Sequence, residues 1–338
     1  MKKNQINILI TGGAGYIGSV LAHDLSENGY NIFIIDNLER GHISLIPKRS
    51  KFFRGDFSNK KILKQVFRNK IDLIIHLAAY IEVEESTKFR KKYINNNFHK
   101  FKSFIQFSEK FCNNLIFAST ASVYKSSNNK LTEESKLEPK NPYAQSKLLA
   151  ENFLTRNKKK NKTNFIILRF FNVAGAHKKF KAGHITNKPT HLIKRLCVFA
   201  LMKKKNFFIY GNKYETPDGT TVRDYIHIAD LSKIISMLIP KILKHKIHKI
   251  FNCGYGKGFS VKEVFDEFNK LFKYKLTPKI QKERSGDLKI LVADPKKIKK
   301  FLNWRPEFNK LSLILKSSMN WEKVINRKFQ RIYGKKIK

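Results

Sequence analysis

Residues 6–18 read INILITGGAGYIG, and this stretch decides the fold of the chain. The apolar run over 6–10 predicts a strand buried on both faces of a parallel sheet. Four glycines follow the run: Gly12, Gly13, Gly15 and Gly18. The last three fit the pattern G-x-G-x-x-G, and the set without Gly13 fits the wider G-x-x-G-x-x-G. Such glycines permit a tight turn and let the backbone approach a pyrophosphate, which the N–H groups of the next helix bind. The alternative is a glycine turn that binds no ligand, and the strand before it and the helix after it argue against that reading.

An acidic residue follows at the position that this type of site requires. A second apolar strand over 32–35 ends in Asp36, about twenty residues beyond the glycines, where an acid binds the ribose 2′-hydroxyl of a dinucleotide. Because Asp36 would repel a 2′-phosphate, the sequence favours NAD over NADP. Arg40 lies nearby and keeps NADP open as the alternative.

Strands and helices alternate along the chain as far as residue 172. This alternation predicts an α/β fold with a doubly wound parallel (Rossmann) sheet. Apolar positions at helical spacing predict one helix over 87–111, and the pattern after residue 172 loosens into a smaller C-terminal part. We expect the last helix to run over 311–324, with a basic, frayed tail from Arg327.

The composition is that of a globular protein with an unusual charge. The chain has 338 residues, 69 Lys and Arg against 26 Asp and Glu, and a net charge of +43. This charge indicates either specific binding to a polyanion or a compositional drift toward Lys, Asn, Ile and Phe. Drift is the better reading, since the lysines are spread over the whole chain. Three distant cysteines form neither a metal-binding spacing nor an even disulfide set, which favours the cytoplasm and no metal. No apolar run is long enough for a membrane span.

A candidate catalytic pair lies on the helix that Asn141-Pro142 opens. Tyr143 and Lys147 are four residues apart and therefore share one helix face. A free phenol has a pKa of about 10, and a neighbouring ammonium and a positively charged nicotinamide favour its phenolate. Tyr143 thus suits general acid–base catalysis, and Thr120 at a strand end is placed to bond the same substrate hydroxyl. An ordinary surface Tyr–Lys pair is the alternative.

Further cofactor contacts are expected at neighbouring strand ends. Asp56 follows the short strand at 52–53, where it either meets the adenine amino group or sits in a solvated turn. Ala78 and Ala79 follow the next strand and are small enough for backbone to pass close to a cofactor. The run 95–97 places three Asn inside a helix, which indicates either contacts with the ligand or an exposed polar face.

At this point the chain resembles the extended short-chain dehydrogenase/reductase family, and within it the UDP-glucose 4-epimerase branch. The matching segments run in order over nearly the whole chain. They include TGGAGYIGS (11–19), RGDFSN (54–59), FASTASVY (117–124), NPYAQSK (141–147), LRFFNVAGAH (168–177) and IYGNKYETPDGTTVRDYIHIADL (209–231). The part from 214 to 231 is much more specific to the epimerases than the glycine and Tyr-x-x-x-Lys motifs.

The resemblance implies a UDP-sugar 4-epimerase that interconverts UDP-glucose and UDP-galactose through a transient 4-keto sugar and bound NAD. Tyr143 would be the base and acid at O4, Lys147 would hold the nicotinamide ribose, and Thr120 would take the place of the usual Ser. The implied cofactor set also includes Tyr16, Ile17, Asn37, Phe57 and Asn96. The implied substrate set is Thr120, Tyr143, Asn172, His191, Leu192, Arg223, Tyr225, Arg284, Asp287 and Leu291. By resemblance Leu291 faces the sugar C2 substituent, which favours plain hexoses over N-acetylated ones.

The resemblance also implies an organisation of the chain. The NAD-binding Rossmann domain would comprise 1–176 and 222–257, the UDP-sugar domain 177–221 and 258–330, and a basic tail 331–338. A homodimer would pack through helices near 87–111 and 141–157. The alternatives are an epimerase of UDP-N-acetylhexosamine or UDP-uronate and, from another class, a dehydrogenase-fold protein that binds polyanions. Departures from the family pattern stand at Ile81, Glu84, Lys100, Phe101, Lys125 and Lys194.

Overall fold

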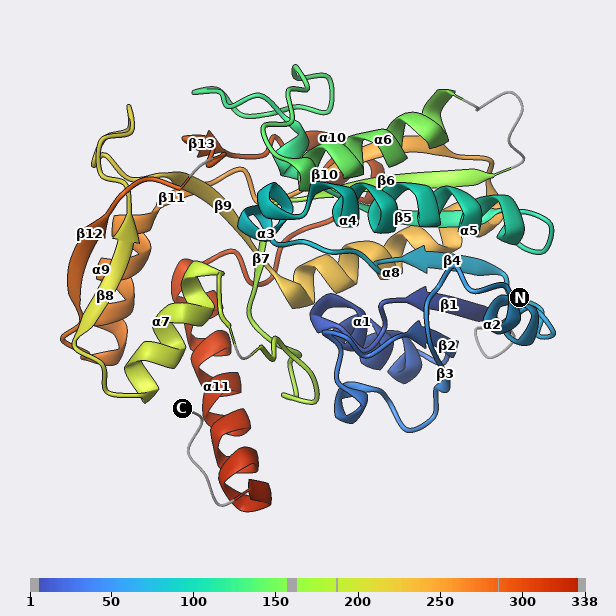
Figure 1. The fold of residues 1–338 in the computed structure, drawn as a ribbon, viewed down its shortest axis with the longest axis horizontal. Coiled ribbons are helices and arrows are strands. Elements are labelled where there is room, and N and C mark those ends of the chain that lie inside the picture. Colours follow the sequence, from blue (N-terminus) through green and yellow to red (C-terminus); the bar gives the residue numbers. More distant parts are fainter. Residues whose placement is uncertain (1–5, 157–162, 187, 285, 334–338) are drawn as a thin grey trace.

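The computed structural model describes residues 6–156, 163–186, 188–284 and 286–333. Its centre is a seven-stranded parallel sheet with the strand order β10-β6-β5-β4-β1-β2-β3 (Figure 1). The strands are β1 (Asn7–Thr11), β2 (Asn31–Asp36), β3 (Lys51–Arg54), β4 (Leu73–His76), β5 (Asn114–Thr120), β6 (Asn164–Phe170) and β10 (His248–Cys253). The chain runs from β1 to one edge and then crosses to β4, so the strand order reverses between β1 and β4. The predicted doubly wound sheet is confirmed, and in sheets of this type ligands bind at the carboxyl ends of the two strands where the order reverses.

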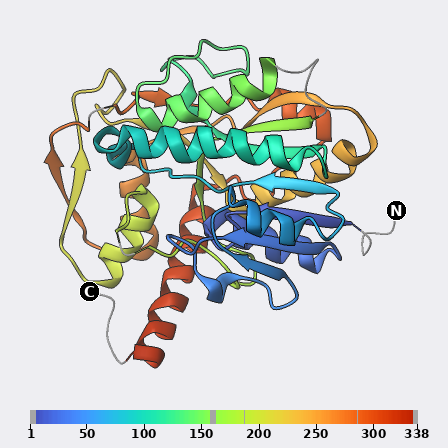
Figure 2. The same cartoon turned by 45° about the vertical axis from the view of Figure 1, so that its right-hand side comes forward.

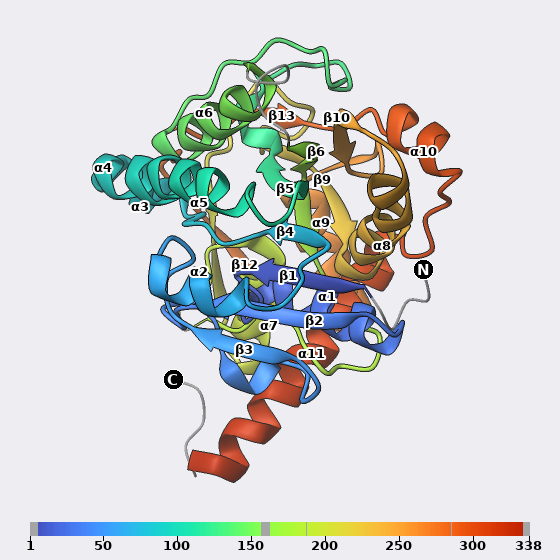
Figure 3. The same cartoon turned by 90° about the vertical axis from the view of Figure 1, so that its right-hand side faces the viewer.

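Helices cover both faces of this sheet because successive side chains of β1 point to opposite sides. Ile8 and Ile10 pack in one apolar core with α1 (Tyr16–Glu27), α8 (Ile228–Lys244) and α10 (Lys296–Leu302), whereas Leu9 packs in a second core on the opposite face. The second layer contains α2 (Lys60–Val66), α3 (Val83–Lys88), α4 (Arg90–Ile94), α5 (Phe101–Ser108) and α6 (Pro142–Arg156). Figure 3 shows the sheet between the two helix layers.

The single helix expected over 87–111 is divided. The chain forms α3, then α4, then a π-helical turn at Asn95–Lys100 and finally α5, which ends at Ser108. Asn97 accounts for the interruption, since its buried side chain bonds to the backbone of Tyr80 and to Ser146 on α6. Such π-turns inside helices are frequent at functional sites.

A smaller body is built mainly from later parts of the chain. In a four-stranded sheet, β9 (Val222–His227) pairs with β7 (Asn172–Ala174), β11 (Gly258–Ser260) and β13 (Ile290–Leu291). A parallel pair, β8 (Asn206–Tyr210) and β12 (Thr277–Gln281), packs with α7 (Leu192–Leu201), α9 (Val261–Phe272) and α11 (Leu311–Tyr333). Figure 2 shows these yellow and orange elements together on one side of the molecule.

The C-terminal helix differs from its expected limits. α11 continues to Tyr333, so the expectation of a frayed tail from Arg327 is wrong up to that residue, and residues 334–338 lie outside the described part. Short 3₁₀ turns stand at Ile43–Leu45 and Ala121–Val123. Among the described residues, no helix combines the length and apolar character that crossing a membrane needs.

Candidate active site

The glycine turn lies directly against the end of β4. Gly12 has a φ of +73°, and a Cβ built there would be 2.7 Å from the backbone nitrogen of Ala78. A Cβ on Gly18 would be 2.2 Å from the carbonyl oxygen of Gly12, so α1 packs on the turn without room for a side chain. Gly15 precedes the first helical residue, Tyr16, with no side-chain cap. The first N–H groups of α1 are therefore available to an anion such as a pyrophosphate.

Asp36 closes this loop from the end of β2. Its carboxylate accepts hydrogen bonds from the backbone N–H groups of Ala14 (3.0 Å) and Leu38 (2.8 Å). The side chain is 8 % exposed, and burial raises the pKa of its carboxyl group. Arg40, the residue that kept NADP open, pairs instead with Glu85 on α3. Its charge is compensated, which favours NAD at the ribose.

The other predicted cofactor residues lie around the same edge of the sheet. The hydroxyl group of Tyr16 donates to the carbonyl oxygen of Gly175 at 2.7 Å, and Ile17 packs against the core. Asn37 accepts the N–H group of Glu39 at 3.0 Å, so its side chain caps the turn after β2. The backbone of Ala78, just after β4, lies so close to Gly12 that it leaves no room for a side chain there.

Asp56 and Phe57 are engaged inside the protein. The carboxylate of Asp56 pairs with Lys100 and accepts the backbone N–H (2.8 Å) and hydroxyl (2.7 Å) groups of Ser58. Burial opposes ionisation of Asp56, but the hydrogen bonds from Lys100 and Ser58 outweigh it and lower its pKa. The ring of Phe57 packs on His76, with ring centroids 4.9 Å apart. Lys100, noted as a departure from the family, thus sits at the expected adenine end.

Among the three consecutive Asn, Asn97 has the most buried position. It accepts the N–H of Tyr80 at 2.9 Å and donates to the hydroxyl oxygen of Ser146 at 3.0 Å. Asn96, which was predicted to contact the cofactor, donates to the side-chain oxygen of Asn97 at 3.1 Å. It therefore supports Asn97 in this network of hydrogen bonds. The run of three Asn indicated polar contacts, but its spacing did not single out Asn97, because the π-turn changes which residues face α6.

The predicted catalytic residues lie together. Tyr143 and Lys147 are both buried on α6, and the hydroxyl group of Thr120 at the end of β5 bonds to Tyr143. The ammonium group of Lys147 donates to the carbonyl oxygen of Ala118 at 2.8 Å. Burial raises the pKa of Tyr143 to about 12, while Thr120 opposes this shift. The expectation of a lowered phenol pKa is therefore wrong for the protein alone. Burial also lowers the pKa of Lys147 to about 7.

Glu82 is a further charged residue near this site, and no sequence motif contains it. It precedes α3, which packs on α6, and its carboxylate lies 3.8 Å from Arg40. Burial has the largest effect on the pKa of both Tyr143 and His191, and the charge of Glu82 raises both. The residue therefore brings a negative charge to the space between the two predicted sets. The sequence shows that Glu82 is acidic, but it does not show that Glu82 lies near Tyr143 and His191.

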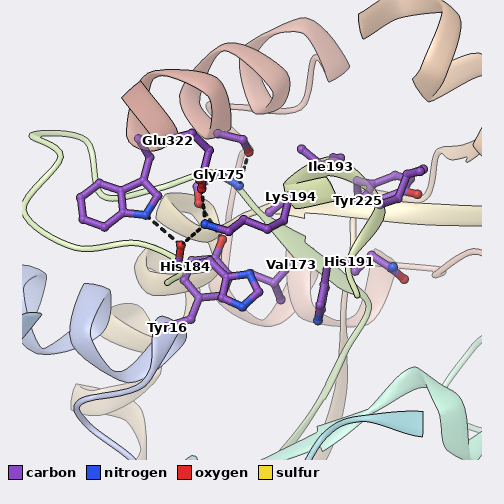
Figure 4. A pocket seen from close by; sticks show the side chains of 14 residues that line it. Tyr16, Val173, Gly175, His184, His191, Ile193, Lys194, Tyr225 and Glu322 are labelled. Carbon is purple, nitrogen blue, oxygen red and sulfur yellow. Dashed lines mark hydrogen bonds and ion pairs between the residues drawn. The ribbon is translucent and has the colours of Figure 1, made fainter. Parts of the chain in front are cut away.

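A pocket between the two bodies brings together part of the predicted substrate set. Its cavity volume is about 30 Å³, and its lining includes Asn172, His191, Leu192 and Tyr225. Figure 4 shows Tyr16 beside His184, and their rings stack with centroids 5.1 Å apart. Lys194, another departure from the family, reaches the back of the pocket, where it pairs with Glu322 and donates to the carbonyl oxygen of His184 at 2.7 Å (Figure 4).

The remaining predicted substrate residues lie outside that lining. Arg223 on β9 is 3.9 Å from the carboxylate of Asp287 and donates to its neighbour's carbonyl at 2.9 Å. Arg284 lies with its guanidinium 3.9 Å from the ring centroid of Tyr210. Leu291 is buried in a separate apolar cluster that contains Phe171. No group of His, Cys, Asp and Glu that could hold a metal ion occurs among the described residues.

The parallel sheet, the glycine turn and the Tyr–Lys helix together define a dinucleotide-dependent enzyme of the dehydrogenase fold. More narrowly, the chain belongs to the NAD dependent epimerase/dehydratase family, whose sequence profile matches residues 8–254. A UDP-glucose 4-epimerase from Azospirillum brasilense is 33% identical over 95% of this chain and 93% of its own length.

Solved structures give the same relationship. The UDP-glucose 4-epimerase from Brucella ovis in complex with NAD is 30% identical, with a TM-score of 0.88 over 93% of this chain and 98% of that one. The UDP-Glc/GlcNAc 4-epimerase from Campylobacter jejuni is 37% identical, with a TM-score of 0.80 over 94% and 99% of the two chains. Each is a relative that this chain resembles over nearly its whole length.

Proposed function

We propose that this protein is a UDP-sugar 4-epimerase that interconverts UDP-glucose and UDP-galactose. The observation that carries the proposal is the convergence of Tyr143, Thr120 and Lys147 at the edge of the sheet where the glycine turn lies. The epimerases among its relatives, which match over nearly the whole length, support the same activity.

NAD fits the residues present at this edge. The cradle of Gly12, Gly15 and Gly18 leaves no room for side chains, and Asp36 stands at the ribose position. Lys147 would hold the nicotinamide ribose. NAD bound there would supply a hydride acceptor at C4 that is regenerated in each cycle, so that it would not be consumed. The other residues proposed to contact NAD are Tyr16, Ile17, Asn37, Asp56, Phe57, Ala78, Ala79 and Asn96.

Tyr143 would take the proton from the 4-hydroxyl group and later return it. Burial stabilises its neutral phenol, so the phenolate depends on the charges that assemble around it. Thr120 holds the phenolic oxygen and the substrate hydroxyl in line, and the buried position of both side chains excludes water.

Arg223 and Arg284 would hold the diphosphate. A guanidinium group matches phosphate oxygens in a bidentate geometry, and both arginines lie near Tyr214 on the smaller body, with Arg223 3.9 Å from Asp287. Asn172, His191, Leu192 and Tyr225 would line the remaining part of the UDP-sugar site from the pocket between the two bodies.

Two residues bear on which sugar fits. Leu291 would lie against the C2 substituent, where extra atoms forced against a packed side chain cost about 1–3 kcal/mol. Glu82 places a negative charge near Tyr143, which disfavours the carboxylate of a UDP-uronate. The Campylobacter jejuni relative is named for both plain and N-acetylated sugars, so UDP-N-acetylglucosamine is the second candidate. Replacement of Leu291 by Cys should raise kcat/KM for the N-acetylated pair selectively, and an unchanged ratio would remove Leu291 as the determinant.

The deciding experiment is turnover of UDP-galactose to UDP-glucose without added reductant. The purified protein should release NAD on denaturation and catalyse the interconversion. A protein that retains NAD but leaves UDP-galactose unchanged would contradict the proposal. Binding to polyanions without turnover would favour the alternative class.

We also propose the organisation that the sequence analysis expects. The proposed NAD-binding domain comprises 1–176 and 222–257, and the proposed UDP-sugar domain comprises 177–221 and 258–330, although β7 and β9 pair within the sheet of the smaller body and α10 packs with the central sheet. The basic tail is proposed for 331–338, of which 331–333 continue α11. A homodimer through α4 and α6 is supported by a groove on these helices and by Leu149, which is 38% exposed. A cytoplasmic location is supported by three cysteines that are all buried and free. Light scattering of the purified protein tests the dimer.

A further inference from the structure

We propose that Glu151 and Arg169 act as a positioning pair that favours the ammonium form of Lys147 and fixes the end of strand β5. The inference rests on the proposed function, because it concerns the lysine beside the acid–base tyrosine. Neither residue belongs to the predicted cofactor or substrate sets. Glu151 lies on a predicted helix and Arg169 on a predicted strand, and no motif or residue spacing in the sequence indicates that they form a pair.

The pair is completely internal. Glu151 on α6 and Arg169 on β6 are each 2% exposed. The Nε atom of Arg169 lies 3.1 and 3.2 Å from the two carboxylate oxygens, and its Nη2 atom lies 2.6 Å from Oε2. The Nη1 atom donates to the hydroxyl oxygen of Tyr124 at 2.8 Å. Such a bidentate geometry is the favourable form of a buried ion pair.

The pair reaches the catalytic residues through three consecutive positions on β5. The hydroxyl group of Ser119 donates to the carboxylate of Glu151. The preceding residue, Ala118, accepts the hydrogen bond from Lys147, and the following residue, Thr120, bonds to Tyr143. The carboxylate of Glu151 therefore holds the middle of a segment whose two neighbours contact the catalytic pair.

The charges around Lys147 decide how stable its ammonium form is in this buried position. Tyr143, Lys147 and Glu151 follow one another at four-residue intervals and so share one face of α6. His76 on β4 faces Lys147 from the sheet and is itself held neutral by burial, and Arg169 lies behind Glu151. Burial is the largest influence on the pKa of Lys147, and Glu151 is the charge that opposes it. The negative charge of Glu151 therefore stabilises the ammonium form of Lys147.

Single substitutions should therefore move the lysine in opposite directions. Glu151→Gln removes the favourable charge and leaves the positive charge of Arg169 unpaired, so the pKa of Lys147 falls. Arg169→Gln leaves the carboxylate of Glu151 for Lys147 alone, so the pKa of Lys147 rises. The double variant, which leaves no buried charge unpaired, should lie between Glu151→Gln and the wild type. A purely structural role predicts losses of stability without opposite shifts.

The test follows Lys147 directly. The protein is labelled with ¹⁵N at the lysine Nζ atoms, and Lys147→Met assigns the signal. The titration midpoint is measured in the wild type, the two single variants and the double variant. Glu322→Gln is the matched control, because it breaks another buried ion pair, with Lys194, in the smaller body. We expect this control to lose stability but leave the Lys147 midpoint unchanged.

The pH dependence of UDP-galactose turnover provides a second measurement. Activity that needs the ammonium form is lost as pH rises through the pKa of Lys147. The alkaline limb should therefore move to lower pH in Glu151→Gln and should not do so in Arg169→Gln. Equal midpoints in all folded variants, or shifts of the same sign in both single variants, would overturn the inference. If a single variant does not fold, the double variant still decides it by its Lys147 midpoint. Absence of turnover in the wild type would instead count against the proposed function and leave the titration result valid.

Discussion

The two halves of the candidate site are built in different ways. The half that would hold the cofactor comes from one short stretch and the adjacent strand ends, and its contacts are between backbone atoms, such as Gly12 with Ala78. The half that would hold the substrate draws on β7, α7, β9 and the segment around Arg284, and its contacts are between side chains. The first half tolerates almost no added atom, whereas the second depends on charge and on loops far apart in the chain. Variants in the cofactor half should therefore lose stability and bound NAD, whereas variants in the substrate half should lose affinity for the substrate.

The largest expected effect lies where the halves meet. Tyr143→Phe keeps the buried ring but removes the group that exchanges the proton of O4, so kcat should fall by roughly 10²–10⁴-fold. NAD content and affinity for UDP should stay at the wild-type level, because neither depends on the phenolic proton. Turnover of UDP-galactose, with NAD measured after denaturation, is the assay. Near-normal kcat in this variant would remove Tyr143 from the mechanism.

A charge in the substrate half should affect binding more than chemistry. Arg223→Gln removes a charge-assisted contact worth about 1.5–3 kcal/mol, so KM should rise by roughly ten- to a hundredfold while kcat changes little. Lys289→Gln is the matched control, since its ammonium group pairs on the surface with Glu215 at 2.7 Å. A similar rise of KM in both variants would show that only the overall charge matters.

The backbone contacts of the cofactor half are tested by a pair of glycines. Gly18→Ala places a Cβ 2.2 Å from a carbonyl oxygen and should cost about 1–3 kcal/mol of unfolding free energy, with loss of bound NAD. Gly286→Ala has open space, with no atom closer than 3.7 Å, but its φ of +81° makes alanine cost about 1–2 kcal/mol. Denaturant unfolding should show both losses, and only the first variant should purify without NAD. Retention of NAD by Gly18→Ala would contradict the tight cradle.

The smallest expected effect is a displacement of the pH profile. Burial is the main cause of the raised pKa of Tyr143, and the carboxylate of Glu82 adds to it. Glu82→Gln removes this negative charge, so the phenolate forms at lower pH and the acid limb of the kcat profile should move to lower pH. Glu84→Gln, two residues further along the chain and exposed, is the control. A shift toward higher pH, or the same shift in the control, would exclude the proposed influence of Glu82.

The features that the sequence predicted correctly depend on residues close together in the chain. The glycine spacing, the acid at Asp36 and the Tyr143–Lys147 interval each lie within one strand–turn–helix unit, so the sheet and the cofactor edge followed from them. Burial was not visible in the same way, and for that reason the direction of the pKa shift of Tyr143 came out opposite to the expectation. Glu82 and the Glu151–Arg169 pair depend on proximity between separate elements, which a single sequence does not reveal. The run at 95–97 was noticed, but the burial of Asn97 rather than Asn96 depends on the π-turn, and apolar periodicity assumes a regular helix.

The π-turn at Asn95–Lys100 also restricts how this segment can vary in length. A π-turn accommodates about one more residue than the regular helix around it. Removal of one residue would restore a continuous α-helix, and every following side chain of α5 would rotate by about 100°. Phe101 and Phe104, now fully buried against the sheet, would turn toward solvent, and Asn97 would leave Tyr80 and Ser146. A homologue that is one residue shorter here therefore needs a different set of apolar positions in its next two turns.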